Sequence, residues 1–393
     1  MRIAFDSQIF CEQVYGGVSR YFSCLTEAFL SGGQDVHVFA PLHQNRYLER
    51  LPPGTVSGVQ LPKCPPRAEY ILRPLNVALA RSRIDRWRPD LVHETYYTRS
   101  RTHSGRCPTV LTVHDMTHEL FADTFNPNDP TRANKAFAVM RADHVICVSE
   151  NTRRDLLTHY EMPQEKTSVV HLGYAPLKPP LGSNAILNQN APYILYVGRR
   201  DYYKNFHGLL KAYAMSPRLQ GDFRVVVFGG GALRRVELEL MDELSIHRSR
   251  VVHLEGDDSD LSQAYEQASV FVYPSLYEGF GIPPLEAMSR SCPVVSSNSS
   301  SMPEVLGNAA QFCDPEQPGS ICDGLEKVLY SSERASELVA RGQERSAAFT
   351  WQRCADQTYA GLPFLWRLRS ADGCQQPSHS AVCTVVLNDA IFW

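Results

Sequence analysis

The stretch VFVYPSLYEGFGIPPLEAM, residues 270–288, combines a strand, a glycine-rich loop and the start of a helix. The apolar run Val270–Tyr273 predicts the strand. Pro283 and Pro284 favour the first turn of a helix, where no partner exists for a backbone N–H. Glu278 is therefore expected in the loop and Glu286 in the helix. A strand that runs through glycines into a helix is the βα unit of a parallel sheet.

The same alternation extends in both directions from this stretch. Strands are predicted at Met1–Phe5, Asp35–Ala40, Leu91–Glu94, Thr109–Val113, His144–Val148, Tyr193–Val197, Arg224–Phe228, Val251–Leu254, Val270–Tyr273 and Pro293–Ser296. Helices are predicted at Ser19–Ser31, Asn134–Arg141, Asn151–Tyr160, Phe206–Ala214, Gly231–Ser245, Leu261–Ala268, Pro284–Arg290, Gly319–Tyr330, Ser331–Phe349 and Trp351–Leu368. Between the halves, GYAPLKPPLGSNAILNQNAP has no apolar period and reads as a linker. The expected fold class is α/β, with two Rossmann-like doubly wound domains facing a cleft.

These patterns divide the chain into five parts. Residues 1–175 form a first domain, 176–191 a linker, 192–350 a second domain, 351–369 a closing helix, and 370–393 a tail without an assigned role. A chain of 393 residues suits two domains better than one.

The composition limits the classes of function. A net charge of −3 gives the chain no bias toward nucleic acid. No run approaches the roughly 18 apolar residues of a membrane span, and the first residues read as a strand, so a cytoplasmic location is expected. The eleven cysteines include no C-x-x-C pair, which favours reduced thiols over a disulfide or zinc framework.

The two carboxylates of the opening stretch suit a sugar ligand. Glu278 and Glu286 would both point into one pocket, where paired acceptors suit the vicinal hydroxyls of a ribose or hexose. Backbone N–H groups of Gly279, Phe280 and Gly281 can approach a ligand closely. The alternative is a turn followed by charge complementarity at a helix N-terminus.

Two cations follow the first strand of the second half. Arg199 and Lys204, in YVGRRDYYKNF, suit a diphosphate, although an exposed charged loop explains them equally. Gly229 and Gly230, in FGGG, lie between a strand and a helix, where backbone N–H groups bind phosphate. The incomplete glycine spacing makes that signal weak.

Three further groups come from other loops. Gly16 and Gly17 precede a helix and would lie against a phosphate or sugar, unless they form only a flexible loop. His114 ends the strand VLTVH and would face the cleft. Asp258 and Asp260 form a D-x-D pattern, but helix capping explains it better than a metal, and no ligand set is complete.

A basic segment lies in the first half. Arg81, Arg83, Arg86 and Arg88 cluster in the expected helix ALARSRIDRW. They would contact anionic lipid headgroups, or form a solvated helix face.

Taken together, these features resemble the family 4 retaining glycosyltransferases, which have the GT-B fold. The resemblance covers roughly residues 1–368. It rests on the E-x7-E spacing of Glu278 and Glu286, on Arg199 with Lys204, on Gly16-Gly17, on His114, and on the segment Ser299–Glu304.

The resemblance implies a role for each site residue and a closing helix, 351–369, that crosses back to the first domain. Arg199 and Lys204 would hold the diphosphate, Glu278 the donor sugar and Glu286 the ribose. The catalytic set is His114, Arg199, Lys204 and Glu278, and the donor-binding set is Gly16, Gly17, Gly229, Gly230, Gly279, Phe280, Gly281, Ile282 and Glu286. The family commonly needs no metal, so no cofactor is expected.

The segments FDSQIFCEQVYGGVSRYF and TVHDMTHE are similar to bacterial mannosyltransferases of surface polysaccharide assembly. This implies GDP-mannose as the donor, followed by UDP-sugars, and a glycan or lipid-linked acceptor in O-antigen-type biosynthesis. The partners expected are therefore the donor, the acceptor and an anionic membrane surface on the inner face of the cell membrane, but no nucleic acid. An epimerase-like enzyme of similar fold and an inactive nucleotide-sugar-binding protein are the alternatives.

Overall fold

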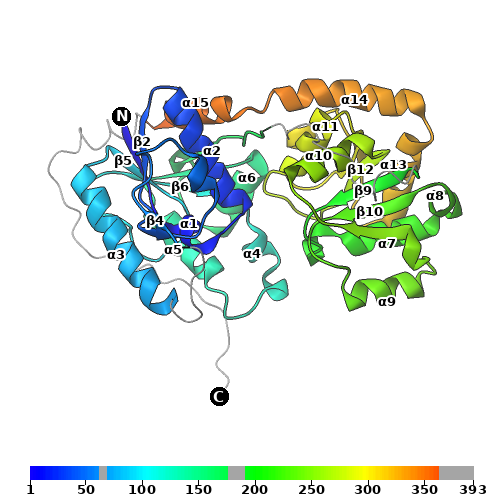
Figure 1. Cartoon of the computed structure of the whole chain (residues 1–393), viewed down its shortest axis with the longest axis horizontal. Coiled ribbons are helices and arrows are strands. Elements are labelled where there is room, and N and C mark those ends of the chain that lie inside the picture. Colours follow the sequence, from blue (N-terminus) through cyan, green and yellow to red (C-terminus); the bar gives the residue numbers. More distant parts are fainter. Residues whose placement is uncertain (62–68, 176–190, 363–393) are drawn as a thin grey trace, which may run out of the picture.

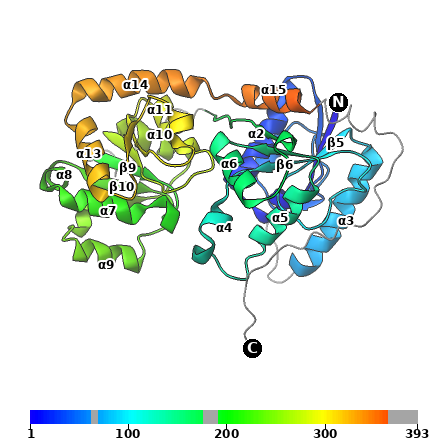
Figure 2. The same ribbon diagram turned by 180° about the vertical axis from the view of Figure 1, so that it is seen from behind.

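The computed structural model describes residues 1–61, 69–175 and 191–362. Within these ranges the chain forms two six-stranded parallel sheets that stand side by side, with helices on both faces of each (Figures 1 and 2). The predicted α/β class with two doubly wound units is confirmed. The predicted linker, apart from residue 191, and the predicted tail lie outside the described residues.

The first sheet has the strand order β2-β1-β5-β6-β7-β8. Its strands are β2 (Asp35–Val38), β1 (Arg2–Phe5), β5 (Leu91–Glu94), β6 (Thr109–Val113), β7 (His144–Cys147) and β8 (Thr167–Val169). A small sheet of β3 (Leu42–His43) and β4 (Val59–Gln60) accompanies it. The central strands are buried along their whole length, as expected for a sheet covered on both faces.

The second sheet has the order β11-β10-β9-β12-β13-β14. Its strands are β11 (Val251–Leu254), β10 (Arg224–Phe228), β9 (Tyr193–Val197), β12 (Val270–Tyr273), β13 (Val294–Ser297) and β14 (Gln311–Cys313). The strand order reverses between β9 and β12, and in the first sheet between β1 and β5. Ligands of such sheets bind outside the carboxyl ends of the strands at this switch point.

Helices connect the strands of each sheet. In the first half they are α1 (Gln8–Glu12), α2 (Gly17–Ser31), α3 (Glu69–Trp87), α4 (Thr117–Leu120), α5 (Thr131–Arg141) and α6 (Glu150–His159). In the second half they are α7 (Phe206–Met215), α8 (Pro217–Asp222), α9 (Arg235–Glu243), α10 (Asp258–Gln267), α11 (Ile282–Ser289), α12 (Met302–Leu306), α13 (Pro318–Leu329) and α14 (Ser332–Ala347).

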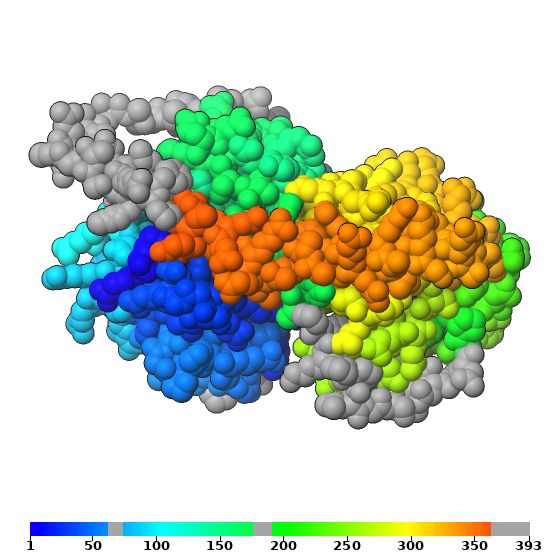
Figure 3. All heavy atoms as spheres, turned by 90° about the horizontal axis from the view of Figure 1, so that it is seen from above, coloured from blue at the N-terminus to red at the C-terminus, as the bar shows by residue number. Residues whose placement is uncertain are grey.

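The last described helix, α15 (Trp351–Gly361), lies on the first half. After α14 the chain bridges the two halves along one side of the molecule (Figure 3). There α15 packs against α2, with the Trp351 ring 5.9 Å from that of Tyr21 and the Tyr359 ring 6.5 Å from that of Phe29. The helix ends at Gly361, and the rest of the predicted Trp351–Leu368, apart from Leu362, lies outside the described residues.

Two sequence predictions of local structure were wrong. The helix predicted from Gly231 begins only at Arg235, because Gly229, Gly230 and Gly231 all take positive φ angles, which no helix can accommodate. The edge strands β8 and β14 were not predicted. Each has only three residues, too few for a hydrophobic period to appear.

Candidate active site

A lysine–glutamate pair lies at the switch point of the second sheet. Lys204 follows β9 and Glu278 follows β12. The Lys204 Nζ donates to both carboxylate oxygens of Glu278, at 2.7 and 2.8 Å. The two loops are also joined by a main-chain bond from Leu276 N–H to the Tyr203 carbonyl. The sequence-predicted residues Lys204 and Glu278 therefore contact each other, and their ion pair holds both side chains in place before any ligand binds.

Two serines form hydrogen bonds with the main chain of the loop that carries Glu278. Ser300 Oγ accepts from the Glu278 N–H at 2.9 Å, and Ser301 Oγ donates to the carbonyls of Glu278 and Phe280. Gly281 then turns the chain into α11 with φ of 90°, a left-handed value that favours glycine. Ser300 and Ser301 belong to the serine-rich segment of the family resemblance, to which no role was given.

Glu286 lies apart from this pair and faces a different cation. It sits on α11, and its Oε1 is 3.5 Å from the Arg20 guanidinium of α2, in the other half. The Tyr265 hydroxyl donates to its Oε2 at 3.4 Å. Burial raises the pKa of Glu286 to about 7, although the charge of Arg20 acts in the opposite direction. Arg20 was not predicted, because its partner is remote in the sequence.

The two adjacent arginines after β9 have different surroundings. The predicted Arg199 is largely exposed and pairs with Asp201 at 3.1 Å. Arg200 is buried, where it binds Glu237 and the carbonyls of Gly229, Gly231 and Ala232.

The buried Arg200 side chain therefore stabilises the triple-glycine turn by binding its carbonyl groups. The Gly229 N–H already donates to the Leu254 carbonyl. A phosphate contact from Gly230 stays a prediction, as does one from Arg199.

His114 follows β6 in the first half and contacts the loop between β12 and α11. A Cβ at Gly279 would collide with the His114 carbonyl, so only glycine permits this approach. Burial lowers the pKa of the His114 imidazole to about 4, so the ring is neutral at pH 7. Its Nε2 is buried and has no hydrogen-bond partner within the described part of the chain. A ligand hydroxyl would satisfy that nitrogen.

Gly16 and Gly17 begin α2 on the same side of the first half. Gly16 is the N-cap of this helix, and its carbonyl accepts from Ser19 Oγ at 3.1 Å. Because Arg20, one turn further on, reaches Glu286, the first turn of α2 faces the second half. The N–H groups of this N-terminus lack helical partners, but the Ser19 N–H donates to Gln13 Oε1 at 3.1 Å, so an anion here would compete with the Gln13 side chain.

The loop Tyr277–Gly281, which we call the donor loop, also forms hydrogen bonds with α6 of the first half. The Gly279 carbonyl accepts from Ser149 Oγ at 2.6 Å and from Thr152 Oγ1 at 3.1 Å. The Tyr277 hydroxyl donates to Asp155 of the same helix at 2.9 Å. The loop between Glu278 and α11 is thus shaped by both halves.

A second contact between the halves involves Glu304 of α12. Its carboxylate accepts from the N–H groups of Glu150 and Asn151, at the start of α6, and lies 2.6 Å from His171 Nε2. Partial burial acts to raise the pKa of Glu304, but hydrogen bonds from His171 and the helix amides hold it below its ordinary value. We call this contact the Glu304 clasp.

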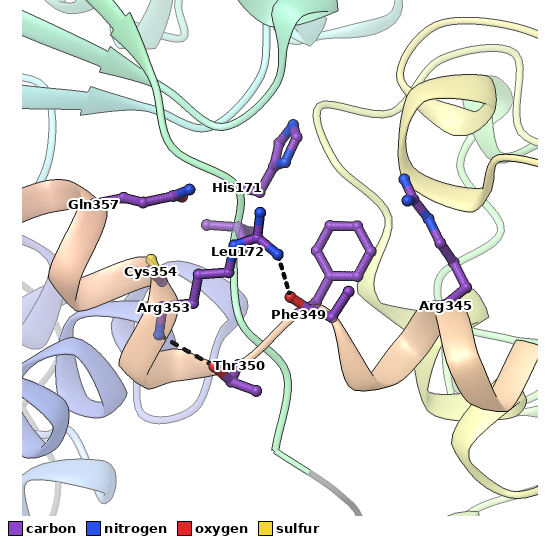
Figure 4. A pocket seen from close by; sticks show the side chains of 9 residues that line it. His171, Leu172, Arg345, Phe349, Thr350, Arg353, Cys354 and Gln357 are labelled. Atoms are coloured by element: carbon purple, nitrogen blue, oxygen red, sulfur yellow. Dashed lines mark hydrogen bonds between the residues drawn. The ribbon is translucent and has the colours of Figure 1, made fainter.

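The crossing between the halves encloses a small cavity of about 140 Å³ (Figure 4). Its lining is His171, Leu172, Arg345, Ala348, Phe349, Thr350, Arg353, Cys354 and Gln357. None of the sequence-predicted site residues lines it, so this cavity lies at the crossing between the halves and not at the candidate site.

Asp258 and Asp260 belong to the start of α10. The helix is capped by Asp257, whose side chain accepts from Ser259 and Asp260 N–H groups, while Asp260 accepts from the Asp257 N–H. The sequence analysis had favoured helix capping for the pattern of Asp258 and Asp260, and the residue at the N-cap is their neighbour Asp257. No cluster of three or more metal-ligating side chains occurs in residues 1–61, 69–175 and 191–362.

The basic segment forms the last turns of α3. Arg81, Arg83 and Arg86 are exposed, and Arg83 donates to the Ser57 carbonyl at 3.2 Å. Contact of this face with anionic lipid stays a prediction. None of the described helices is long and apolar enough to cross a membrane. The eight cysteines of the described ranges are all free thiols.

Comparisons with known proteins agree with this geometry. The family model "Glycosyltransferase Family 4" matches residues 15–176, and "Glycosyl transferases group 1" matches residues 183–345. The O-antigen chain mannosyltransferase B of Escherichia coli is 30% identical over 63% of this chain and 68% of its own length. The serotype-specific mannosyltransferase WbdA of Escherichia coli is 28% identical over 58% of this chain, which spans only 30% of that protein.

A solved structure shares the fold. Sucrose-phosphate synthase from Thermosynechococcus elongatus aligns with a TM-score of 0.72 and 21% identity, over 94% of this chain and 99% of that one. Family models cover both halves, and the two sheets have the matching architecture. The chain therefore belongs to the family 4, or group 1, retaining glycosyltransferases with the GT-B fold.

Proposed function

We propose that this glycosyltransferase moves a hexose, mannose first among them, from a nucleoside diphosphate to a glycan or lipid-linked acceptor in polysaccharide biosynthesis. The observation that carries the proposal is the Lys204–Glu278 pair at the switch point of the second sheet. Mannose and polysaccharide synthesis are supported by the names of two relatives that are 28–30% identical over part of the chain.

The site supplies the chemistry of transfer in distinct parts. As the bond between sugar and diphosphate breaks, negative charge grows on the departing phosphate. Lys204 is a preorganised cation at that place, and the first turn of α2 adds N–H groups. Glu278 would accept hydrogen bonds from the sugar hydroxyls while its loop is held by Ser300 and Ser301.

The first half would complete the sugar site through His114. Its buried Nε2 is neutral at pH 7 and has no partner in the described residues, so it suits a hydroxyl of the donor sugar. A phosphate oxygen on the same face of the sugar would take the acceptor's proton, which agrees with retention and requires no protein nucleophile.

The donor is tested by incubating the protein with GDP-mannose or UDP-glucose and a mannose-terminated oligosaccharide. We expect transfer from GDP-mannose, a product that keeps the α configuration, and unchanged turnover in excess EDTA. A product of inverted configuration would contradict the mechanism. Loss of turnover in EDTA, restored by Mn²⁺, would contradict metal independence.

Two alternative functions have their own outcomes in the same experiment. Conversion of the donor to another sugar nucleotide without acceptor would identify an epimerase-like enzyme. Binding of the donor without turnover by any acceptor would identify an inactive binding protein. Preferential transfer from UDP-glucose would support the glycosyltransferase activity but identify UDP-glucose, in place of GDP-mannose, as the donor.

A further inference from the structure

Arg20 crosses from the first half to a carboxylate of the second. It lies on α2, just after the Gly16-Gly17 loop, and its Nη1 is 3.5 Å from Glu286 Oε1 on α11. Its side chain is 25% exposed, whereas that of Glu286 is only 6% exposed. The pair is thus partly shielded from water, where the attraction between opposite charges is stronger than at the surface.

The groups that face Glu286 differ in sign. Arg20 from α2 favours the ionised carboxylate, and the Tyr265 hydroxyl from α10 donates to it. Asp258, at the start of α10, opposes its ionisation. Burial also opposes it and raises the pKa of Glu286 to about 7. Among the described groups that face Glu286, Arg20 is therefore the cation that favours the ionised carboxylate.

The charge of Glu286 matters for its proposed contact. An ionised carboxylate accepts from two hydroxyls at once, and such charge-assisted bonds are stronger than neutral ones. A protonated carboxyl would become a donor at one of its oxygens. A ribose presents two adjacent hydroxyls, which match the ionised form.

We propose that Arg20 is a positioning residue for the nucleotide sugar: it holds Glu286 ionised and oriented, so that the ribose site is complete only when both halves meet. The inference rests on the proposed function, in which Glu286 binds the ribose. Arg20 acts through Glu286 and needs no contact with the reacting atoms. Donor affinity is then coupled to the approach of the two halves, because the ion pair has one member on each.

The experiment uses the whole chain with Arg20→Gln and Arg20→Lys, and with Arg46→Gln as a control. Arg46 is an exposed arginine of the same half that pairs with Glu49. Calorimetry gives the Kd of GDP and of UDP from pH 6 to 8.5, and a melting curve checks each fold.

In the parent, nucleotide affinity should rise with pH through about 7 as Glu286 ionises. Arg20→Gln should move this midpoint upward and weaken binding at pH 7 by about fivefold or more, since losing a nearby opposite charge shifts a pKa by roughly one unit at least. Raising the pH to 8.5 should recover part of the loss. Arg20→Lys should keep most of the parent's profile, and Arg46→Gln all of it.

Two results separate this inference from the proposed function. If Arg20→Gln binds nucleotide as the parent does at every pH, while Glu286→Gln loses affinity, the role of Arg20 is overturned and the proposed function stands. If the parent binds neither GDP nor UDP, the proposed function fails, and the role of Arg20 fails with it. A weakening by Arg20→Gln that is equal at every pH would also overturn it, because a merely structural role gives no shift.

Discussion

The two carboxylate–cation pairs of the cleft are built differently. Lys204 and Glu278 both belong to the second half, in loops that main-chain and serine contacts fix in place. Arg20 and Glu286 belong to different halves, at a longer distance of 3.5 Å. The first pair needs no residue of the other half as a partner, although its neighbours Tyr277 and Gly279 are bonded to α6. The second exists only while the halves are together, so the chain separates a permanent charge site from a conditional one.

The largest expected effect breaks the permanent pair. Lys204→Ala should lower kcat by about 10²–10³, because a preorganised stabiliser of the charge on the leaving diphosphate is removed. The loss should appear in kcat more than in KM if the contact strengthens in the transition state. Steady-state transfer assays measure both. Lys211→Ala, which removes an exposed lysine of α7, is the matched control. Near-normal turnover of Lys204→Ala would remove the cationic site from the mechanism.

A smaller effect should follow when the conditional pair loses its carboxylate. Glu286→Ala should chiefly raise the donor KM, because ribose hydroxyls do not change charge during transfer. Hydrogen bonds to a charged group contribute about 1.5–3 kcal/mol, which corresponds to roughly a 10- to 100-fold rise. Glu239→Ala, an exposed carboxylate of α9, serves as control. A fall in kcat with constant KM would instead place Glu286 in the chemical step.

The smallest expected effect concerns the Glu304 clasp, one of the contacts between the two halves. Glu304→Gln should lower the free energy of unfolding by about 1 kcal/mol, because it removes a negative charge that binds the first N–H groups of α6, whose N-cap is Ser149. The melting temperature should fall by about 2–4 °C. Glu344→Gln, exposed on α14, should change neither quantity.

The pH dependence of the Glu304 clasp follows from the lowered pKa of Glu304. A carboxyl with a lowered folded pKa stabilises the protein above its unfolded pKa, about 4.3, and loses this contribution as the pH falls through the folded value. The difference between Glu304→Gln and the parent should thus be present at pH 5 to 6 and shrink below about pH 4. An equal difference at pH 3 would show that the Glu304 charge has no part in it.

Much of the fold could be predicted because most of its central strands are continuous, mainly apolar runs of four or five residues. Val270–Tyr273 is buried throughout, and so is His144–Cys147. The short edge strands carried no such signal. The helix predicted from Gly231 failed for another reason. Glycines before a helix fit a helix start or a tight turn equally, and Arg200 favours the turn by binding its carbonyls.

The site was predictable where residues are close in sequence or follow adjacent strands. Lys204 and Glu278 were both predicted to bind the donor, and in the structure they meet because β9 and β12 flank the switch point. Arg20 and Ser149 could not be found in this way. Their partners are Glu286 and Gly279, and only the arrangement of the two halves brings them into contact.

The contacts between the two halves decide which residues matter when a half is exchanged for that of a related enzyme. At the Glu304 clasp the first half offers main-chain N–H groups of Glu150 and Asn151, and at Gly279 the second half offers a carbonyl. Main-chain groups are present whatever the side chain, but a foreign half would still have to supply the side chains that meet them and each other: Arg20, Ser149, Thr152 and Asp155 on one side, and Tyr277, Glu286 and Glu304 on the other. Exchange of whole halves between relatives would therefore succeed only where these matched pairs are kept.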